Sequence, residues 1–187
     1  MRKLIVLALL PVLAGCLTAS SPEVSQWNIE YVGKSRMAKG AKYDVVRISQ
    51  VLVRSPYNLS GIAVLRANGS MAFDHYNEYA AQPSSLIKGV VFEALGASGL
   101  CRIVVNPSSS VPSSASLEVL VTKLALDCRQ DGVRRAVASV LVRVLGKDVV
   151  DIARGEGEVD AADGNYGAAF SRAVSAALDS AFAQLRQ

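Results

Sequence analysis

The sequence predicts an α+β domain of two layers, in which about eight strands form a mostly antiparallel sheet covered by two helices. Two observations lead to this fold class. Segments with the alternation or β-branched composition of strands come in two groups, and a segment with helical spacing follows each group, which gives the order ββββαββββα. Turn sequences rich in Gly, Pro, Asn and Ser separate the segments. The predicted strands are 27–32, 43–53, 62–66, 71–79, 101–105, 117–126, 133–145 and 149–159.

Turns delimit the strands of the first half. The segment 43–53 ends at 55–58, where the sequence Ser-Pro-Tyr-Asn is a strong turn signal. The tripeptide Ala-Asn-Gly at 67–69 lies between 62–66 and 71–79. This spacing predicts a hairpin closed by a tight turn.

Both helices are predicted from apolar stripes and from their first residues. The first begins at Pro83, because proline lacks the N–H that would have no partner in the first turn. The second covers 165–185 and has two candidate caps, Asp163 and Asn165. The two stripes consist of Leu86, Ile87, Val90, Val91, Ala94 and Leu95, and of Tyr166, Phe170, Val174, Leu178, Phe182 and Leu185.

Two cysteines of the domain are expected to lie close together. Strands 101–105 and 117–126 follow one another through a mobile loop of Ser and Pro, so an antiparallel pairing would place Cys101 beside Cys128. In an oxidising compartment such a pair can form a disulfide, subject to its narrow Cα spacing. The alternative is two buried free thiols, and the sequence leaves both open.

The N-terminus has the pattern of a bacterial export signal. Arg2 and Lys3 precede the largely apolar segment 4–13, which at about 1.5 Å per residue is too short to cross a ~30 Å hydrocarbon core. The sequence Leu-Ala-Gly-Cys at 13–16 resembles the lipobox of bacterial lipoproteins, whose cysteine carries a diacylglycerol. Cys16 is therefore the expected lipidation site.

This pattern divides the chain into a lipoprotein signal peptide (1–15), a flexible tether (16–26) and one domain (27–187). By the same resemblance, Leu17 after the cysteine, in place of an inner-membrane retention aspartate, favours the outer membrane. The domain would then face the periplasm.

Charge and composition argue against several classes of function. The 20 basic and 16 acidic residues are scattered, unlike the basic patch of a nucleic-acid-binding protein. The only histidine is His75, and the sequence has no nucleophile, dinucleotide-binding, phosphate-binding or EF-hand motif. One histidine and two distant cysteines do not supply a metal-ligand cluster. We therefore expect no catalytic residue, no cofactor and no metal.

Two stretches resemble the ABC-type transport auxiliary lipoprotein family, which includes the PqiC-type intermembrane transport lipoproteins. They are RSPYNLSGIAVLR at 54–66 and HYNEYAAQPSSLIKGVVFEAL at 75–95. The family has a Pro-Tyr/Leu turn before a strand that ends in Leu-Arg, here Leu65-Arg66. A second strand ends in an aromatic-Ala-x-Pro motif, here 79–83, and a helix follows. The family often has Trp where this chain has Tyr79.

The resemblance implies a non-enzymatic subunit at the outer membrane that assists lipid transport together with an MCE-domain protein and an ABC transporter. Docking to these partners and self-association into a homo-oligomer are the expected interactions. Edge strands and the Ser/Pro-rich loop 106–116 are the expected contact surfaces. The alternatives are a lipoprotein that regulates cell-wall synthesis or outer-membrane assembly, and a hydrolase that uses His75.

Overall fold

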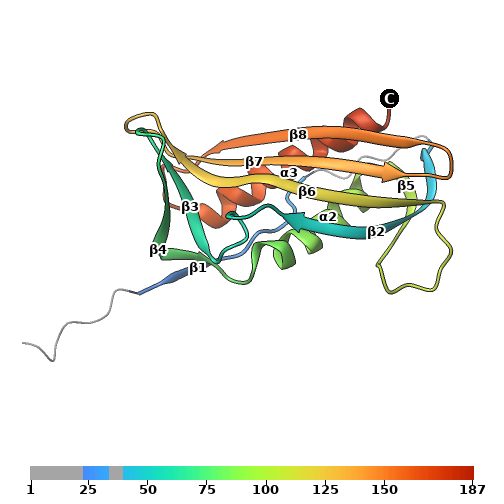
Figure 1. Cartoon of the computed structure of the whole chain (residues 1–187), viewed down its shortest axis with the longest axis horizontal. Helices are drawn as coiled ribbons and strands as arrows, with labels where there is room; N and C mark the ends of the chain where they lie inside the picture. The colour runs from blue at the N-terminus through green and yellow to red at the C-terminus, as the bar shows by residue number, and fades with distance from the viewer. Residues whose placement is uncertain (1–22, 34–39) are drawn as a thin grey trace, which may run out of the picture.

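The computed structural model describes residues 23–33 and 40–187, and in this part of the chain two helices pack on one face of an eight-stranded sheet (Figure 1). The predicted fold class and the order of the elements are confirmed. Neither described helix is long and apolar enough to cross a membrane. The predicted signal peptide and Cys16 lie outside the described residues. The elements are β1 (Ser25–Trp27), β2 (Tyr43–Val53), β3 (Gly61–Arg66), β4 (Met71–Tyr79), α2 (Pro83–Ser98), β5 (Cys101–Val105), β6 (Ala115–Cys128), β7 (Arg135–Leu145), β8 (Val150–Asp160) and α3 (Tyr166–Leu185).

Strand β6 organises the sheet. Strand β7 pairs antiparallel with almost all of β6, and β8 pairs antiparallel with β7. On its other side, β6 pairs in parallel with β2 along its first half and with β3 at its C-terminal end. Strand β5 adds to β2 in parallel, β4 adds to β3 antiparallel, and β1 adds to β4 in parallel. The sheet is therefore mixed, and the predicted antiparallel pairing holds for its longest ladders.

The parallel pairings arise because β5 and β6 do not form a hairpin. Val105 at the end of β5 is level with Arg47 of β2, and Ala115 at the start of β6 is level with Val46. The loop between β5 and β6 therefore crosses over β2, and the chain continues in the same direction on its other side. Sequential strands are usually neighbours, so the sequence alone favoured the hairpin.

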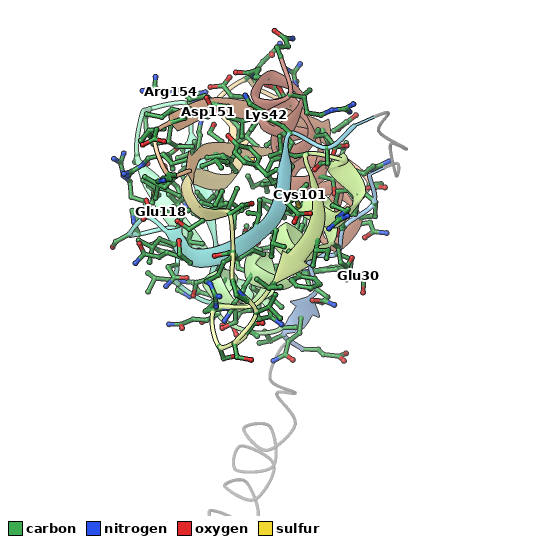
Figure 2. All side chains as sticks on the ribbon, turned by 90° about the vertical axis from the view of Figure 1, so that its right-hand side faces the viewer. Glu30, Lys42, Cys101, Glu118, Asp151 and Arg154 are labelled. Carbon is green, nitrogen blue, oxygen red and sulfur yellow. The ribbon has the colours of Figure 1, made fainter. Side chains whose placement is uncertain are left out.

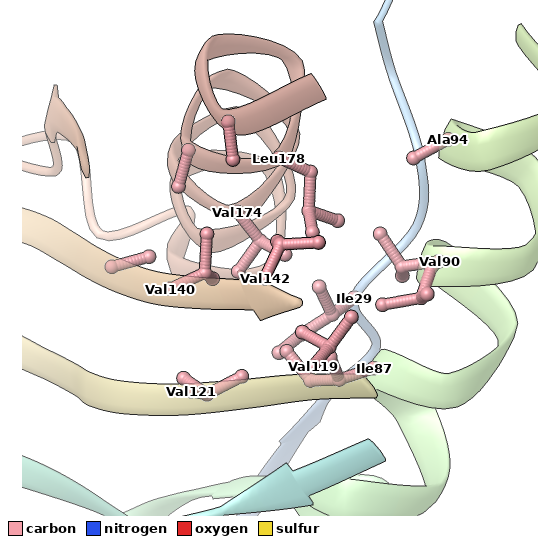
Figure 3. Close-up of a cluster of buried hydrophobic side chains, with 14 of the residues drawn as sticks. Ile29, Ile87, Val90, Ala94, Val119, Val121, Val140, Val142, Val174 and Leu178 are labelled. Carbon is pink, nitrogen blue, oxygen red and sulfur yellow. The ribbon is translucent and has the colours of Figure 1, made fainter. Parts of the chain in front are cut away.

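The core lies between the sheet and the two helices. Figure 3 shows side chains of β6 and β7 meeting α3, with Ile29 between these strands and α2. Ile29 is only 3% exposed, so the segment before β2 is part of the core. The largest fully buried side chains are Phe170, Phe182, Ile48, Ile62, Ile87, Leu95, Leu100, Leu117, Leu124, Leu178, Val46 and Val91.

Helix α3 approaches β8 unusually closely, at two glycines. A Cβ atom on Gly155 would lie 1.8 Å from the carbonyl oxygen of Ala177, and one on Gly157 would lie 1.9 Å from that of Ala173. The glycines are two residues apart, so they share the helix-facing side of the strand. Only glycine leaves enough room for the helix backbone at these positions.

The N-terminal strand is shorter and earlier than predicted. Alternation of Trp27, Ile29 and Tyr31 predicts a strand over 27–32, but β1 covers Ser25–Trp27 and so begins inside the predicted tether. The following residues instead lie along α3. The N–H of Glu30 donates to Ser171 Oγ (3.0 Å), and that of Val32 donates to Ser175 Oγ (3.0 Å). Hydroxyl groups of α3 thus take the place of a neighbouring strand as hydrogen-bond partners. The alternation of apolar and polar residues is the same in both situations, so it could not tell one from the other.

The helix boundaries agree with the sequence signals. Pro83 is the first residue of α2, and Gly99 ends the helix in the left-handed conformation, with φ of 69°. Asn165 caps α3, because its side-chain oxygen accepts a hydrogen bond from the N–H of Ala168 (3.1 Å). Asp163, the other candidate, accepts from the N–H of Asn165.

Tyr79 is packed in the core through its ring. The ring meets Phe170 of α3 edge to face, with 5.5 Å between the centroids. Its buried hydroxyl has no hydrogen-bond partner among the described residues, and burial raises the pKa of this group far above its ordinary value. An unpaired buried polar group costs about 1–3 kcal/mol. The fold therefore uses the aromatic ring at this position and not the hydroxyl.

Candidate docking surface

Within the described residues, no group of three or more His, Cys, Asp or Glu side chains could hold a metal ion. His75 lies exposed in β4. A shallow hollow of about 370 Å³ lies at the β6–β7 end of the sheet, but its charged side chains already pair with one another. The pairs are Asp127 with Arg129 (2.5 Å) and Arg135 with Glu158. The hollow therefore offers an incoming ion little uncompensated charge.

Of the two alternatives that the sequence leaves open for Cys101 and Cys128, the structure has the free thiols. Cys101 is level with Tyr43 at the start of β2, whereas Cys128 is level with Arg66 at the end of β3. Because β5 and β6 run in the same direction, almost the whole of β6 separates the two cysteines. A strand of that length spans about 40 Å, whereas a disulfide needs Cα atoms within about 7 Å.

We expect mass spectrometry of the unreduced Cys16→Ala chain to find two free thiols. Cys128 should react with iodoacetamide faster than Cys101, which is 7% exposed. Burial raises the pKa of Cys101 to about 11 and raises that of Cys128 less strongly, so the thiolate is scarcer at Cys101. The slow phase of the reaction with iodoacetamide should disappear in the Cys101→Ser variant, which assigns that phase to Cys101. A peptide pair that is joined only before reduction would contradict the strand order.

Within the described part of the chain, no helix covers the sheet face of β2, β6, β7 and β8 that faces the viewer in Figure 1. Leu52, Leu120 and Leu141 form a row across β2, β6 and β7. Val150 and Ile152 of β8 are 58% and 61% exposed, and Leu52 is 46% exposed. We call these five residues the docking face. Residues of four strands contribute to it, so the sequence pattern could not have located it without the strand order.

Paired charges lie among these apolar side chains. Glu118 and Arg143 lie on neighbouring strands in the next row, with 3.5 Å between their charged groups. Gln50 and Ile152 lie at the two ends of that row. Exposed apolar groups around a few polar pairs are typical of protein–protein interfaces.

The other end of the same sheet face is covered by the chain itself. Ala63, Ala125 and Val137 form a small second core there. Tyr57 and Phe73, with Leu65 and Met71, pack against it. The docking face therefore lies on the part of this sheet face that the described chain leaves open.

Arg47 holds the loop that crosses β2. Its guanidinium donates hydrogen bonds to the carbonyl oxygens of Ser109 (2.6 Å), Val111 (2.6 Å) and Pro107 (3.1 Å). The Ser and Pro content of this loop suggests mobility, but three bonds to one fixed arginine oppose it. An arginine in a strand rich in apolar residues was the signal that could have indicated such a clamp.

A second polar cluster closes this end of the molecule (Figure 2). Asp151 of β8 accepts hydrogen bonds from the Tyr43 hydroxyl and, at 3.0 Å, pairs with Lys42. Lys42 also donates to the carbonyl oxygen of Leu185 at the end of α3. The bond from Tyr43, followed by Lys42, lowers the pKa of Asp151, while burial and the neighbouring carboxylate raise that of Tyr43 to about 12. These contacts fix β8 to β2 and α3 beside the docking face.

The chain is similar in fold to two solved structures. A Xanthomonas campestris protein of the family DUF330 is 14% identical, with 83% of this chain and 87% of that chain covered and a TM-score of 0.55. An uncharacterized protein is 10% identical, with 87% and 97% covered and a TM-score of 0.58. The PelC dodecamer from Paraburkholderia phytofirmans is 16% identical, with 78% and 87% covered, but its TM-score of 0.37 is too low to carry an inference. No family model matches the chain, and no curated protein matches it.

Proposed function

We propose that the protein is a periplasmic lipoprotein, anchored to the outer membrane through Cys16, that serves as a non-enzymatic auxiliary subunit of an ABC/MCE-type lipid transport system. The observation that carries this proposal is the docking face. Exposed aliphatic side chains on an uncovered sheet face are suited to contact with a partner protein. They have no group that could react with a substrate.

The sequence motifs that resemble the auxiliary lipoproteins occupy matching structural places. Pro56 and Tyr57 form the turn between β2 and β3, and Arg66 ends β3. Tyr79 ends β4, and Pro83 opens α2 directly afterwards. The motifs are therefore positions that the fold itself needs, which supports the resemblance in fold and leaves the partner to experiment.

The docking face suggests the chemistry of its partner. Leu52, Val150 and Ile152 would bury aliphatic surface, at about 25 cal/mol per Å². Glu118 and Arg143 satisfy each other, so the partner needs only a few polar groups at this row. Addition of a strand at the free edge of β8 is less favoured, because Gln184 already binds the Arg154 carbonyl and Glu156 and Glu158 are exposed there.

Purification of the lipidated full chain in mild detergent tests this function. We expect an MCE-domain protein to co-purify, identified by mass spectrometry. Ile152→Glu should reduce its recovery about tenfold, because a charge replaces a side chain in the interface. Phe92→Glu is the matched control, since Phe92 is exposed on α2 on the opposite layer.

Two results would overturn the proposal. One is a purified chain that brings down no MCE-domain protein. The other is equal loss of that protein with Ile152→Glu and Phe92→Glu. Recovery of a cell-wall synthase or an assembly protein in its place would favour the alternative lipoprotein role. Recovery of tagged and untagged copies of this chain together would test the predicted self-association.

A further inference from the structure

Strand β4 contains a pronounced bulge at Asp74–Asn77. Ala63 of β3 is paired with Phe73, but Gly61, two residues away, is paired with Glu78. Four residues of β4 therefore stand opposite one residue of β3. Bulges of this kind redirect side chains and are often functional.

The bulge is built firmly by side-chain hydrogen bonds. The Asp74 carboxylate accepts from the N–H groups of Tyr76 (2.8 Å) and Asn77 (3.1 Å), and from the Asn77 side-chain amide (3.1 Å). The side-chain oxygen of Asn77 in turn accepts from the indole N–H of Trp27 in β1 (2.9 Å). Its conformation is therefore held from within by Asp74 and from β1 by Trp27.

This construction exposes an aromatic side chain that the core does not use. Tyr76 is 55% exposed at the tip of the bulge, next to the exposed His75. Val24, which precedes β1, is 44% exposed. Because Ser25 pairs in parallel with Asn77, Val24 lies beside Tyr76. An aliphatic and an aromatic side chain thus share one exposed surface.

The same pairing places this surface where the tether joins the domain. Ser25 lies only nine positions after Cys16, and nine residue steps span at most about 30 Å when fully extended. A domain anchored through Cys16 must therefore keep the bulge close to the bilayer. The bulge joins through β3 to the C-terminal end of β6, whereas the docking face extends from Leu120 in the middle of β6 toward Val150 at the other end of the β6–β8 ladders.

We infer that the Asp74–Asn77 bulge rests on the phospholipid headgroups of the anchoring membrane, with Tyr76 and Val24 in the interface. This inference rests on the proposed lipid anchor. Tyrosine suits the headgroup region because its ring is apolar and its hydroxyl remains hydrated. Glu23 directly precedes Val24, and Glu78 directly follows the bulge. Their carboxylates would repel an anionic headgroup, so a zwitterionic lipid such as phosphatidylethanolamine fits better. The contact orients the domain, so that the docking face is directed away from the membrane.

Fluorescence of the lipidated protein in phosphatidylethanolamine/phosphatidylcholine liposomes tests the contact. Trp27 is the only native tryptophan and gives the baseline. In Tyr76→Trp, we expect blue-shifted emission and at least about twofold stronger quenching by brominated lipids than in Val149→Trp. Val149 is the matched control, because it is 54% exposed in the β7–β8 turn, far from the bulge.

The outcomes separate the contact from the anchor. Flotation of the protein with the liposomes, together with a diacylglycerol mass on Cys16, shows that the anchor is present. If the protein floats but Tyr76→Trp and Val149→Trp are quenched equally, the membrane contact is refuted and the anchor stands. If the protein does not float, the anchor fails, and the inference fails with it. Circular dichroism of both variants confirms that each is folded.

Discussion

Gly155→Ala is expected to destabilise the domain by about 3 kcal/mol or more, which is near the upper end for a single methyl group. The new Cβ atom would lie 1.8 Å from the carbonyl oxygen of Ala177 and 3.0 Å from the nitrogen of Ala181. These are backbone atoms of α3, so no side-chain rotation relieves the clash, and the helix must move away from β8. Urea unfolding followed by circular dichroism measures the loss.

Gly89→Ala provides the matched control. Gly89 is exposed within α2, and beyond the local helix backbone no atom of the described residues lies within 4 Å of a Cβ atom built there. Replacing a glycine inside a helix should stabilise the protein by about 0.5–1 kcal/mol. If both variants unfold at the same urea concentration, α3 does not approach β8 as closely as described.

The positions of the elements could be predicted because local chemistry decides them. Pro83 suits the first turn of a helix and not its interior. The side-chain oxygen of Asn165 accepts a hydrogen bond from a backbone N–H in the first turn of α3. The bounds of β2 follow from a run rich in β-branched residues that ends before a turn sequence. In each case the deciding residues lie within a few positions of one another, so a single sequence contains the whole argument.

The pairing of the strands could not be predicted in the same way. The crossing of β5 and β6 over β2 involves contacts between distant parts of the chain, such as the bonds from Arg47 to loop carbonyls some 60 residues further along. The free cysteines follow from that crossing. Gly155 and Gly157 carried a readable signal, because alternate glycines in a strand indicate a close backbone neighbour. The sequence did not show that the neighbour is α3.

The candidate surfaces were the least predictable part. Leu52 of β2 and Ile152 of β8 come to one sheet face through the pairing of β6 and β7 between these two strands. The Tyr76 bulge requires a register shift between β3 and β4, and alternation through 71–79 gives no sign of it. One motif was enough to predict Cys16 as a lipidation site, whereas several distant strands define each surface, so the sequence could not indicate the surfaces.

Cys16→Ala is expected to abolish function while leaving the domain folded. The described fold begins at β1, nine residues after Cys16, so the melting temperature should stay the same. Fractionation should find the variant soluble instead of membrane-bound. Even one acyl chain gives only marginal membrane binding, about 0.8 kcal/mol per buried CH₂, so a chain with no acyl group and a single interfacial tyrosine would not stay attached.

The functional part of this prediction is complementation of a deletion strain. Thr18→Ala, two residues away in the tether, should restore membrane integrity, and Cys16→Ala should not. In the proposed function the reason is positional: a partner that spans the periplasm would meet the docking face only if Cys16 held the domain at the outer membrane and the bulge oriented it. Full rescue by soluble Cys16→Ala protein at native abundance would contradict this, because the docking face would then act without an anchor.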